Sequence, residues 1–277
     1  MSNAVKRVVS GICFGVVMLA SFLLGDIAFF IVFHLLIVLM LKEFYNMTTG
    51  RDRSLVKILG ISMGVLLFFV VRSIARGGNP VLLFCLLIVF LLALLCHFTF
   101  SREDGHIRYV YTLAGILYIA LPFSMANFIF YSGASGGYML MLFFIIIWAG
   151  DIGAYAVGST LGKKYDRKFC PSVSPKKTWA GCAGGFAFSV IAAAAASCIF
   201  SAYGLETLPV AHAVALGVVI NISGTLGDLC ESRWKRIFGL KDSGNLIPGH
   251  GGMLDRLDSS LFAIPAGLFY LTIFSLI

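Results

Sequence analysis

Runs of about 20 consecutive apolar residues recur from one end of this 277-residue chain to the other, and each is long enough to cross a bilayer as a helix. Hydrophobic residues make up 59% of the sequence. The mean hydropathy is +0.95, higher than a soluble domain of this size carries. The sequence therefore predicts an all-α polytopic integral membrane protein.

We predict about nine transmembrane helices in a single domain, residues 1–277. Residues 1–160 would supply the N-terminal helices. Residues 161–277 would form the catalytic part, with two basic loops at 162–178 and 236–255. The predicted spans are residues 7–25, 27–42, 55–72, 80–99, 109–131, 138–161, 179–203, 207–236 and 259–277. Pro122 should kink or break the fifth span, because proline cannot donate the helical hydrogen bond.

Lysine and arginine are distributed unequally between the two sides of this layout. The N-terminus and every second loop carry 19 of the 21, and only Arg72 and Arg76 fall on the other side. The positive-inside rule then places the N-terminus and both basic loops in the cytoplasm, and the C-terminus outside. This bias, together with anionic lipids and substrates, explains the net charge of +8 without a nucleic-acid partner.

The densest ionisable stretch runs from residue 228 to residue 258. Asp228, Ser232 and Lys235 are spaced to share one face of a helix, and Asp255 and Asp258 have the same relation after a basic, glycine-containing loop. Carboxylates provide the hard oxygens that Mg²⁺ prefers. Cations stabilise phosphoryl groups, and glycine lets backbone approach a ligand closely. The pattern indicates a divalent metal and a polyphosphate. Asp258 has a structural alternative, since the helix dipole favours an acid at a helix start.

A second basic cluster precedes the seventh span. Thr178 can cap that helix, which would place its free N–H groups and the side chains of Lys176 and Lys177 at one anion-binding site. The residues alone favour the alternative, a juxtamembrane cluster that binds anionic lipid headgroups generally. In the seventh span itself, Gly181, Gly184 and the alanine run 192–196 predict close packing against neighbouring helices.

The sixth span contains Asp151, an acid within the membrane. Intramembrane acids are functional candidates by default, and we expect Asp151 to face the same cavity as Asp228. Metal binding, orientation of a lysine and a structural role all stay open for it.

The stretch 228–258 resembles the signature of the phosphatidate cytidylyltransferase family, the CDP-diacylglycerol synthases. The matching positions are Ser232, Lys235, Arg236, Lys241, Asp242, His250, Gly251, Gly252, Asp255, Arg256 and Asp258. The string SPKKTW at 174–179 is similar to a second family motif. Two departures are Trp234, where an aliphatic residue is usual, and Ala180, where bacterial relatives often have Glu.

The resemblance implies an enzyme of the cytoplasmic membrane, with its active site facing the cytoplasm. It would condense CTP with phosphatidate to give CDP-diacylglycerol and diphosphate. Asp228 and Asp255 would hold Mg²⁺, and Lys235 and Ser232 would complete the catalytic set. The expected substrate-binding residues are Lys176, Lys177, Arg236, Lys241, Asp242, His250, Gly251, Gly252, Arg256, Asp258 and Asp151. The expected partners are the two substrates and the bilayer. A second copy of the chain, forming a homodimer, is a further candidate partner.

Two alternatives are weighed against this interpretation. A CTP-dependent polyprenol or lipid kinase resembles the family but phosphorylates an alcohol, and the full Lys-Asp to Asp-Arg-x-Asp string argues against it. An ion or solute transporter would also place acids in the membrane. Against the transporter, the charges cluster on one side and no inverted repeat is apparent.

Overall fold

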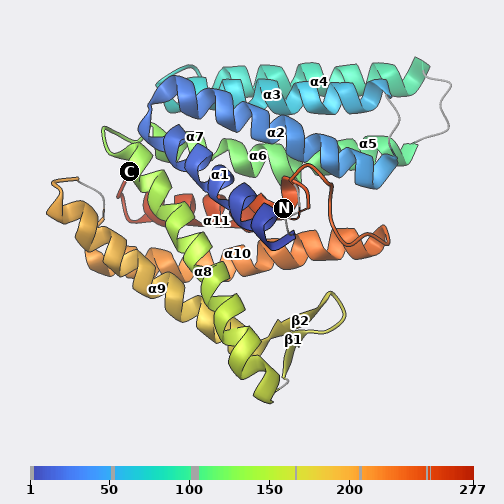
Figure 1. Cartoon of the computed structure of the whole chain (residues 1–277). Helices are drawn as coiled ribbons and strands as arrows, with labels where there is room; N and C mark the ends of the chain where they lie inside the picture. Colours follow the sequence, from blue (N-terminus) through green and yellow to red (C-terminus); the bar gives the residue numbers. More distant parts are fainter. Residues whose placement is uncertain are drawn as a thin grey trace. The chain divides into compact units, whose positions relative to one another are not determined.

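The structure of the chain is a computed structural model that describes residues 3–50, 54–100, 106–165, 167–205, 208–247, 249 and 251–277. Helices account for almost all of these residues (Figure 1). They are α1 (Asn3–Leu23), α2 (Asp26–Thr49), α3 (Leu55–Ala75), α4 (Val81–Phe100), α5 (His106–Gly115), η1 (Ile116–Ala120), α6 (Leu121–Ser124), α7 (Ala126–Phe130), α8 (Gly136–Tyr165), α9 (Trp179–Ala202), α10 (Val210–Ile237) and α11 (Leu254–Ile273).

Within the described ranges, seven helical segments are long and apolar enough to cross a membrane. They are α2, α3, α4, the continuous segment His106–Phe130, α8, α9 and α10. The predicted helical membrane protein is therefore confirmed. Crossings by α1, whose apolar part is the shorter Val8–Leu23, and by α11 stay predictions, as does the side of the membrane on which each end lies.

The fifth predicted span is interrupted next to Pro122. A π-helical turn, η1, ends at Ala120, and Pro122 lies in the first turn of the short helix α6. Pro122 cannot donate a helical hydrogen bond, and a π-type turn is one of the ways in which a helix absorbs such a defect. The predicted break is confirmed.

A small β-hairpin departs from the all-α pattern. Strands β1 (Lys168–Cys170) and β2 (Ser174–Thr178) pair antiparallel, with Lys168 opposite Thr178. Pro175 lies in β2, which a two-stranded sheet tolerates because both of its strands are edges. Residues 162–178 were predicted only as a basic loop, and the hairpin within it was not predicted, since a hairpin this short carries little periodic signal.

The chain divides into two compact units, each described by itself. The N-terminal unit comprises Met1–Tyr131 and Asp242–Arg256, and the C-terminal unit comprises Ser132–Lys241 and Leu257–Ile277. The helix α8 thus belongs to the unit that holds most of the candidate site. The interpretation of residues 1–277 as one domain stays a prediction.

Aromatic side chains form the core of the N-terminal unit. Phe29 of α2 stacks on Phe130 of α7 with ring centroids 4.0 Å apart, and Phe33 stacks on Phe123 at 4.7 Å. Such rings bury a large apolar area in a few contacts. The packing fixes α2 against the interrupted fifth segment.

The two arginines assigned to the outer side meet a single acid in this unit. Arg72 Nη2 lies 2.6 Å from Asp26 Oδ2, and Arg76 Nη1 lies 3.0 Å from the same oxygen. The Tyr131 hydroxyl also contacts this carboxylate. The cluster ties together the start of α2, the end of α3 and the end of α7.

Small residues bring the helices of the C-terminal unit into close contact, as Figure 1 shows for α8 and α9. A Cβ added at Gly184 of α9 would lie 2.7 Å from the carbonyl oxygen of Gly153 in α8. One added at Gly227 of α10 would lie 2.6 Å from the carbonyl oxygen of Asp258 in α11. Glycine is required at these crossings because any side chain would push the helices apart. The predicted close packing of the seventh span is confirmed.

Candidate active site

A cavity of about 530 Å³ lies within the C-terminal unit. Helices α8, α9 and α10, the strand β2 and the start of α11 all contribute to its wall. Glycines of α8 and α9 form much of the wall, so the cavity exists because small side chains leave space between closely packed helices. Its polar residues include Asp151, Lys176, Lys177, Asn221, Asp228 and Ser259.

An ion pair joins the two predicted constellations across this cavity. Lys177 Nζ of β2 lies 2.6 Å from Asp228 Oδ2 of α10, and both side chains are partly shielded from solvent. The hairpin and the helix cap hold the lysine in place, since Thr178 Oγ1 accepts a hydrogen bond from Gly181 N at 3.1 Å. This confirms the predicted cap. Lys176 is more exposed but lines the same cavity.

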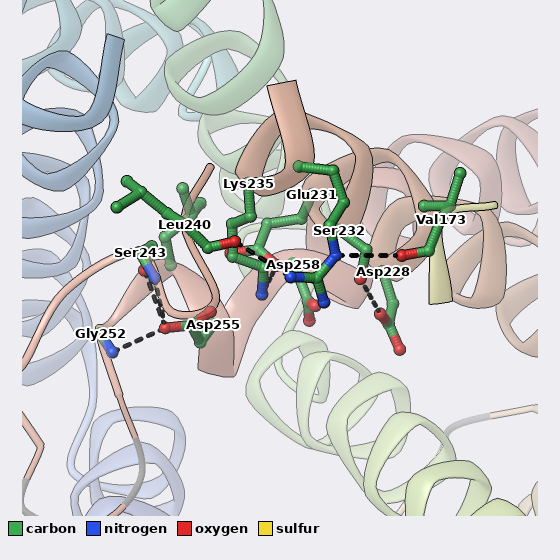
Figure 2. Close-up of polar contacts among 12 residues, drawn as sticks. Val173, Asp228, Glu231, Ser232, Lys235, Leu240, Ser243, Gly252, Asp255 and Asp258 are labelled. Carbon is green, nitrogen blue, oxygen red and sulfur yellow. Dashed lines mark hydrogen bonds and ion pairs between the residues drawn. The ribbon is translucent and has the colours of Figure 1, made fainter. Parts of the chain in front are cut away.

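The polar face predicted for the eighth span is present on α10. Ser232 Oγ donates to Asp228 Oδ1 at 3.3 Å, as Figure 2 shows. One turn further on, Lys235 is buried and forms an ion pair with the fully buried Glu231. Sequence reasoning missed Glu231, although its position four residues before Lys235 is the usual spacing of a helical ion pair.

Two further carboxylates lie near Asp228. Asp258, at the start of α11, interacts unfavourably with the charges of Asp228 and Asp151 and favourably with that of Lys235. Asp258 Oδ1 accepts a hydrogen bond from Ser259 N at 2.7 Å. The structure places Asp151 and Asp228 in the wall of the same cavity, as predicted for Asp151.

The carboxylates of Asp228 and Asp258 interact electrostatically. Their mutual repulsion is relieved by a positive charge, and carboxylate oxygens are what Mg²⁺ prefers. The described residues contain no group of three or more acidic, histidine or cysteine side chains that could hold a metal ion alone. Substrate phosphates and water would therefore complete the coordination, which is the usual arrangement for Mg²⁺ at a nucleotide site.

Asp255 belongs to the N-terminal unit and has a different environment. Its Oδ2 accepts hydrogen bonds from Ser243 N at 2.9 Å, Ser243 Oγ at 3.0 Å and Gly252 N at 2.8 Å (Figure 2). These bonds close the loop between α10 and α11. Because Asp228 and Asp255 lie in different units, their predicted convergence on one metal ion stays a prediction.

The loop closed by Asp255 needs its glycines. Gly251 has φ of +88°, a conformation that side chains rarely adopt. A Cβ at Gly252 would collide with Ser243 Oγ and with the carboxylate of Glu43. His250, the first residue of the His-Gly-Gly string, lies outside the described residues.

The remaining basic candidates lie at the surface of their units. Arg236 Nε donates to the carbonyl oxygen of Val173 at 3.4 Å, which connects the end of α10 to the hairpin. Lys241 and Arg256 are exposed, as is the acidic candidate Asp242. Exposed cations of this kind are accessible to a phosphate group from solvent.

A second missed residue is Glu43 of α2. It accepts hydrogen bonds from Met253 N at 2.9 Å and Leu254 N at 2.8 Å, at the start of α11. The only signal in the sequence was its position in a long apolar run, where an acid is a functional candidate by default. Nothing local could reveal a partner 210 residues later.

Comparison with known proteins gives matches over nearly the whole chain. The model of the cytidylyltransferase family matches residues 5–274. The phosphatidate cytidylyltransferase of Bacillus subtilis (strain 168) is 32% identical over 283 residues, covering 99% of this chain and 100% of the relative. That of Staphylococcus saprophyticus is 29% identical, with 94% and 95% covered. That of Rickettsia bellii is 38% identical over 163 residues, with 58% and 68% covered.

Proposed function

The chain belongs to the cytidylyltransferase family, and from this premise we propose how its own residues carry out the reaction. The reaction is the transfer of a cytidylyl group from CTP to phosphatidate. An oxygen of the phosphatidate phosphate forms a bond to the α-phosphorus of CTP. The bond between that phosphorus and the oxygen leading to the β-phosphate breaks, and diphosphate leaves with the electron pair. The products are CDP-diacylglycerol and diphosphate.

The Lys177–Asp228 ion pair in the wall of the cavity is the observation that carries the proposal. The phosphate of phosphatidate is already an anion near neutral pH, so no strong base is needed to create the nucleophile. Catalysis then consists of positioning the two phosphates and neutralising their charge. Lys177 is held by β2 and by the cap of α9, and it can exchange Asp228 for a substrate phosphate.

Carboxylates of the stretch 228–258 are proposed to hold Mg²⁺. We retain Asp228 and Asp255 as the principal pair and add Asp258, because Asp258 lies within electrostatic range of Asp228. When bound, the ion would neutralise charge on the triphosphate and so ease the departure of diphosphate. Ser232 orients Asp228 through its hydrogen bond, and Glu231 keeps Lys235 in place on the same helix.

The other basic residues are proposed to bind phosphoryl oxygens of either substrate. They are Lys176, Lys235, Arg236, Lys241 and Arg256, with Asp151, Asp242, His250, Gly251 and Gly252 completing the substrate site. Arginine and lysine side chains stabilise the negative charge that phosphoryl transfer spreads over the oxygens. The positive-inside bias supports a site that faces the cytoplasm in the cytoplasmic membrane.

The full-length match distinguishes this reaction from the two alternatives. The relatives that match nearly the entire chain are phosphatidate cytidylyltransferases. These matches favour cytidylyl transfer over lipid phosphorylation or transport. The homodimer stays a prediction, which the molar mass of the purified protein in detergent would check.

Incubation of the purified protein with labelled CTP and phosphatidate tests the function. We expect labelled CDP-diacylglycerol and one equivalent of diphosphate, and no transfer of the γ-phosphate to a polyprenol. Labelled phosphate on an added polyprenol, with no CDP-diacylglycerol formed, would contradict the proposal.

A further inference from the structure

Glu43 connects two parts of the N-terminal unit that are far apart in the sequence. It lies near the end of α2, and its carboxylate is directed at the start of α11. Oε1 accepts from Met253 N at 2.9 Å, and Oε2 accepts from Leu254 N at 2.8 Å and from Ser243 Oγ at 3.1 Å. Both carboxylate oxygens are therefore used by the loop that carries the signature residues.

These bonds make Glu43 a helix cap supplied by another helix. The first N–H groups of any helix lack partners within it, and a side-chain acceptor must satisfy them. Leu254 is the first residue of α11 and Met253 precedes it. A carboxylate at this end is additionally favoured by the helix dipole. Glu43 thus sets where α11 begins.

The start of α11 carries three candidate site residues in its first two turns. Asp255, Arg256 and Asp258 follow directly after the two capped N–H groups. Side chains rotate by about 100° per helical residue, as follows from 3.6 residues per turn. A shift of the helix start by one residue would therefore turn all three side chains away from their present directions.

The loop is shaped around the Glu43 carboxylate. A Cβ at Gly244 would lie 2.7 Å from Glu43 Oε1, and one at Gly252 would collide with Oε2. Two of the loop glycines, including the second glycine of the His-Gly-Gly string, are thus required by the approach of this acid. The close approach of Glu43 therefore involves a residue of the signature, Gly252.

Ser243 couples Glu43 to Asp255. Its Oγ lies 3.1 Å from Glu43 Oε2 and 3.0 Å from Asp255 Oδ2. A hydroxyl has a single proton to donate, so it serves both carboxylates in turn or shares its proton between them. A change at Glu43 will therefore alter the hydrogen bonding of Asp255.

We propose that Glu43 is a positioning residue for the cytidylyl transfer, acting through Ser243 and the start of α11 on Asp255, Arg256 and Asp258. The inference rests on the proposed roles of those three residues. Glu43 need not touch either substrate. Its effect should appear in the use of CTP and Mg²⁺, because it orients the groups assigned to them.

The test compares Glu43→Gln with Lys42→Gln, each purified in detergent. Glutamine keeps the shape but has one acceptor oxygen, so its amide NH₂ faces an N–H donor at Met253 or Leu254. We expect kcat/KM for CTP to fall about 10- to 100-fold, as for other residues that orient a metal-binding group, with a higher half-saturating Mg²⁺ concentration. The midpoint of thermal unfolding should stay within a few degrees of wild type. Lys42 is the exposed neighbour on α2, and its variant should match wild type within twofold.

Ser243→Ala provides a second variant in case Glu43→Gln folds poorly. It removes only the bridging hydroxyl and should give a smaller loss with the same rise in half-saturating Mg²⁺. Wild-type kinetic constants for the folded fraction of both variants would overturn the proposal and leave Glu43 with a purely structural role. Failure of the assigned reaction is a separate outcome, because it would appear in the wild-type protein.

Discussion

The substitution Asp228→Asn tests the proposed centre most directly, because it removes one charge and preserves the shape of the side chain. Lys177 Nζ lies 2.6 Å from Asp228 Oδ2, with 24% and 30% of the two side chains exposed. At that separation, the Coulomb attraction is about 6 kcal/mol for an effective dielectric constant of 20. Desolvation and screening cancel most of it, so we expect a loss of about 1–3 kcal/mol from breaking the pair.

A second effect of Asp228→Asn raises the free energy of unfolding, whereas loss of the ion pair lowers it. Asp228 repels the carboxylate of Asp258, and the amide removes that repulsion. The free energy of unfolding should therefore change by less than the ion pair alone suggests. For a membrane domain of this length we expect the unfolding midpoint to move by no more than about 4 °C.

The activity should fall far more than the stability. Removing one preorganised electrostatic group from an active site typically costs about 10²- to 10³-fold in rate, or roughly 3–4 kcal/mol of transition-state stabilisation. We expect kcat/KM for Asp228→Asn to fall by this factor, and the residual rate to respond weakly to Mg²⁺. Formation of labelled CDP-diacylglycerol, measured across a Mg²⁺ titration, gives both quantities.

Two results would refute the reasoning. One is an Asp228→Asn variant that keeps its activity within threefold of wild type. The other is full wild-type activity in excess chelator with no added divalent ion. Lys42→Gln, purified in parallel, controls for losses caused by extraction into detergent.

The other predictions concern the shared site, the basic pair and the topology. Asp255→Asn should lower kcat/KM about as much as Asp228→Asn does. The double variant should be hardly worse than either single variant, because residues that act as one unit are not additive; multiplicative losses would contradict a shared metal. Lys177→Ala should raise KM for a phosphate-bearing substrate more than Lys176→Ala does, since Lys177 is ion-paired in the cavity. If both variants kept the wild-type kinetic constants, the basic cluster would be only a membrane-surface patch. Labelling of introduced cysteines should find the loops 162–178 and 236–255 cytoplasmic and the C-terminus outside. A result that places both termini on the same side would rule out nine crossings.

The helices and most of their limits follow from local patterns. A run of apolar residues reaches across a bilayer whatever surrounds it, so the spans could be placed within a few residues at most ends. The break at Pro122 also follows from one residue, since the missing N–H is a property of proline itself. The signature residues were found for a similar reason, because the spacing of Asp228, Ser232 and Lys235 fixes a common helical face.

The β-hairpin and the partners of the site residues were not predictable in this way. Three residues of β1 facing five of β2 are too few for a periodic signal. The pairing of Lys177 with Asp228 depends on how closely α8, α9 and α10 approach, and that depends on glycines such as Gly153 and Gly184 fitting against one another. Spacing along the chain contains no measure of that fit.

The sequence by itself determined that this chain is a helical membrane protein with the signature of a cytidylyltransferase, because apolar length and motif spacing act locally. Only the tertiary structure decided which acids meet. It placed Asp151 and Asp228 in the wall of one cavity and left Asp255 bound to its own loop. It also joined Glu43 to a backbone N–H 210 residues later. The free N–H groups at a helix start can donate to any carboxylate that the packing of other helices brings within reach.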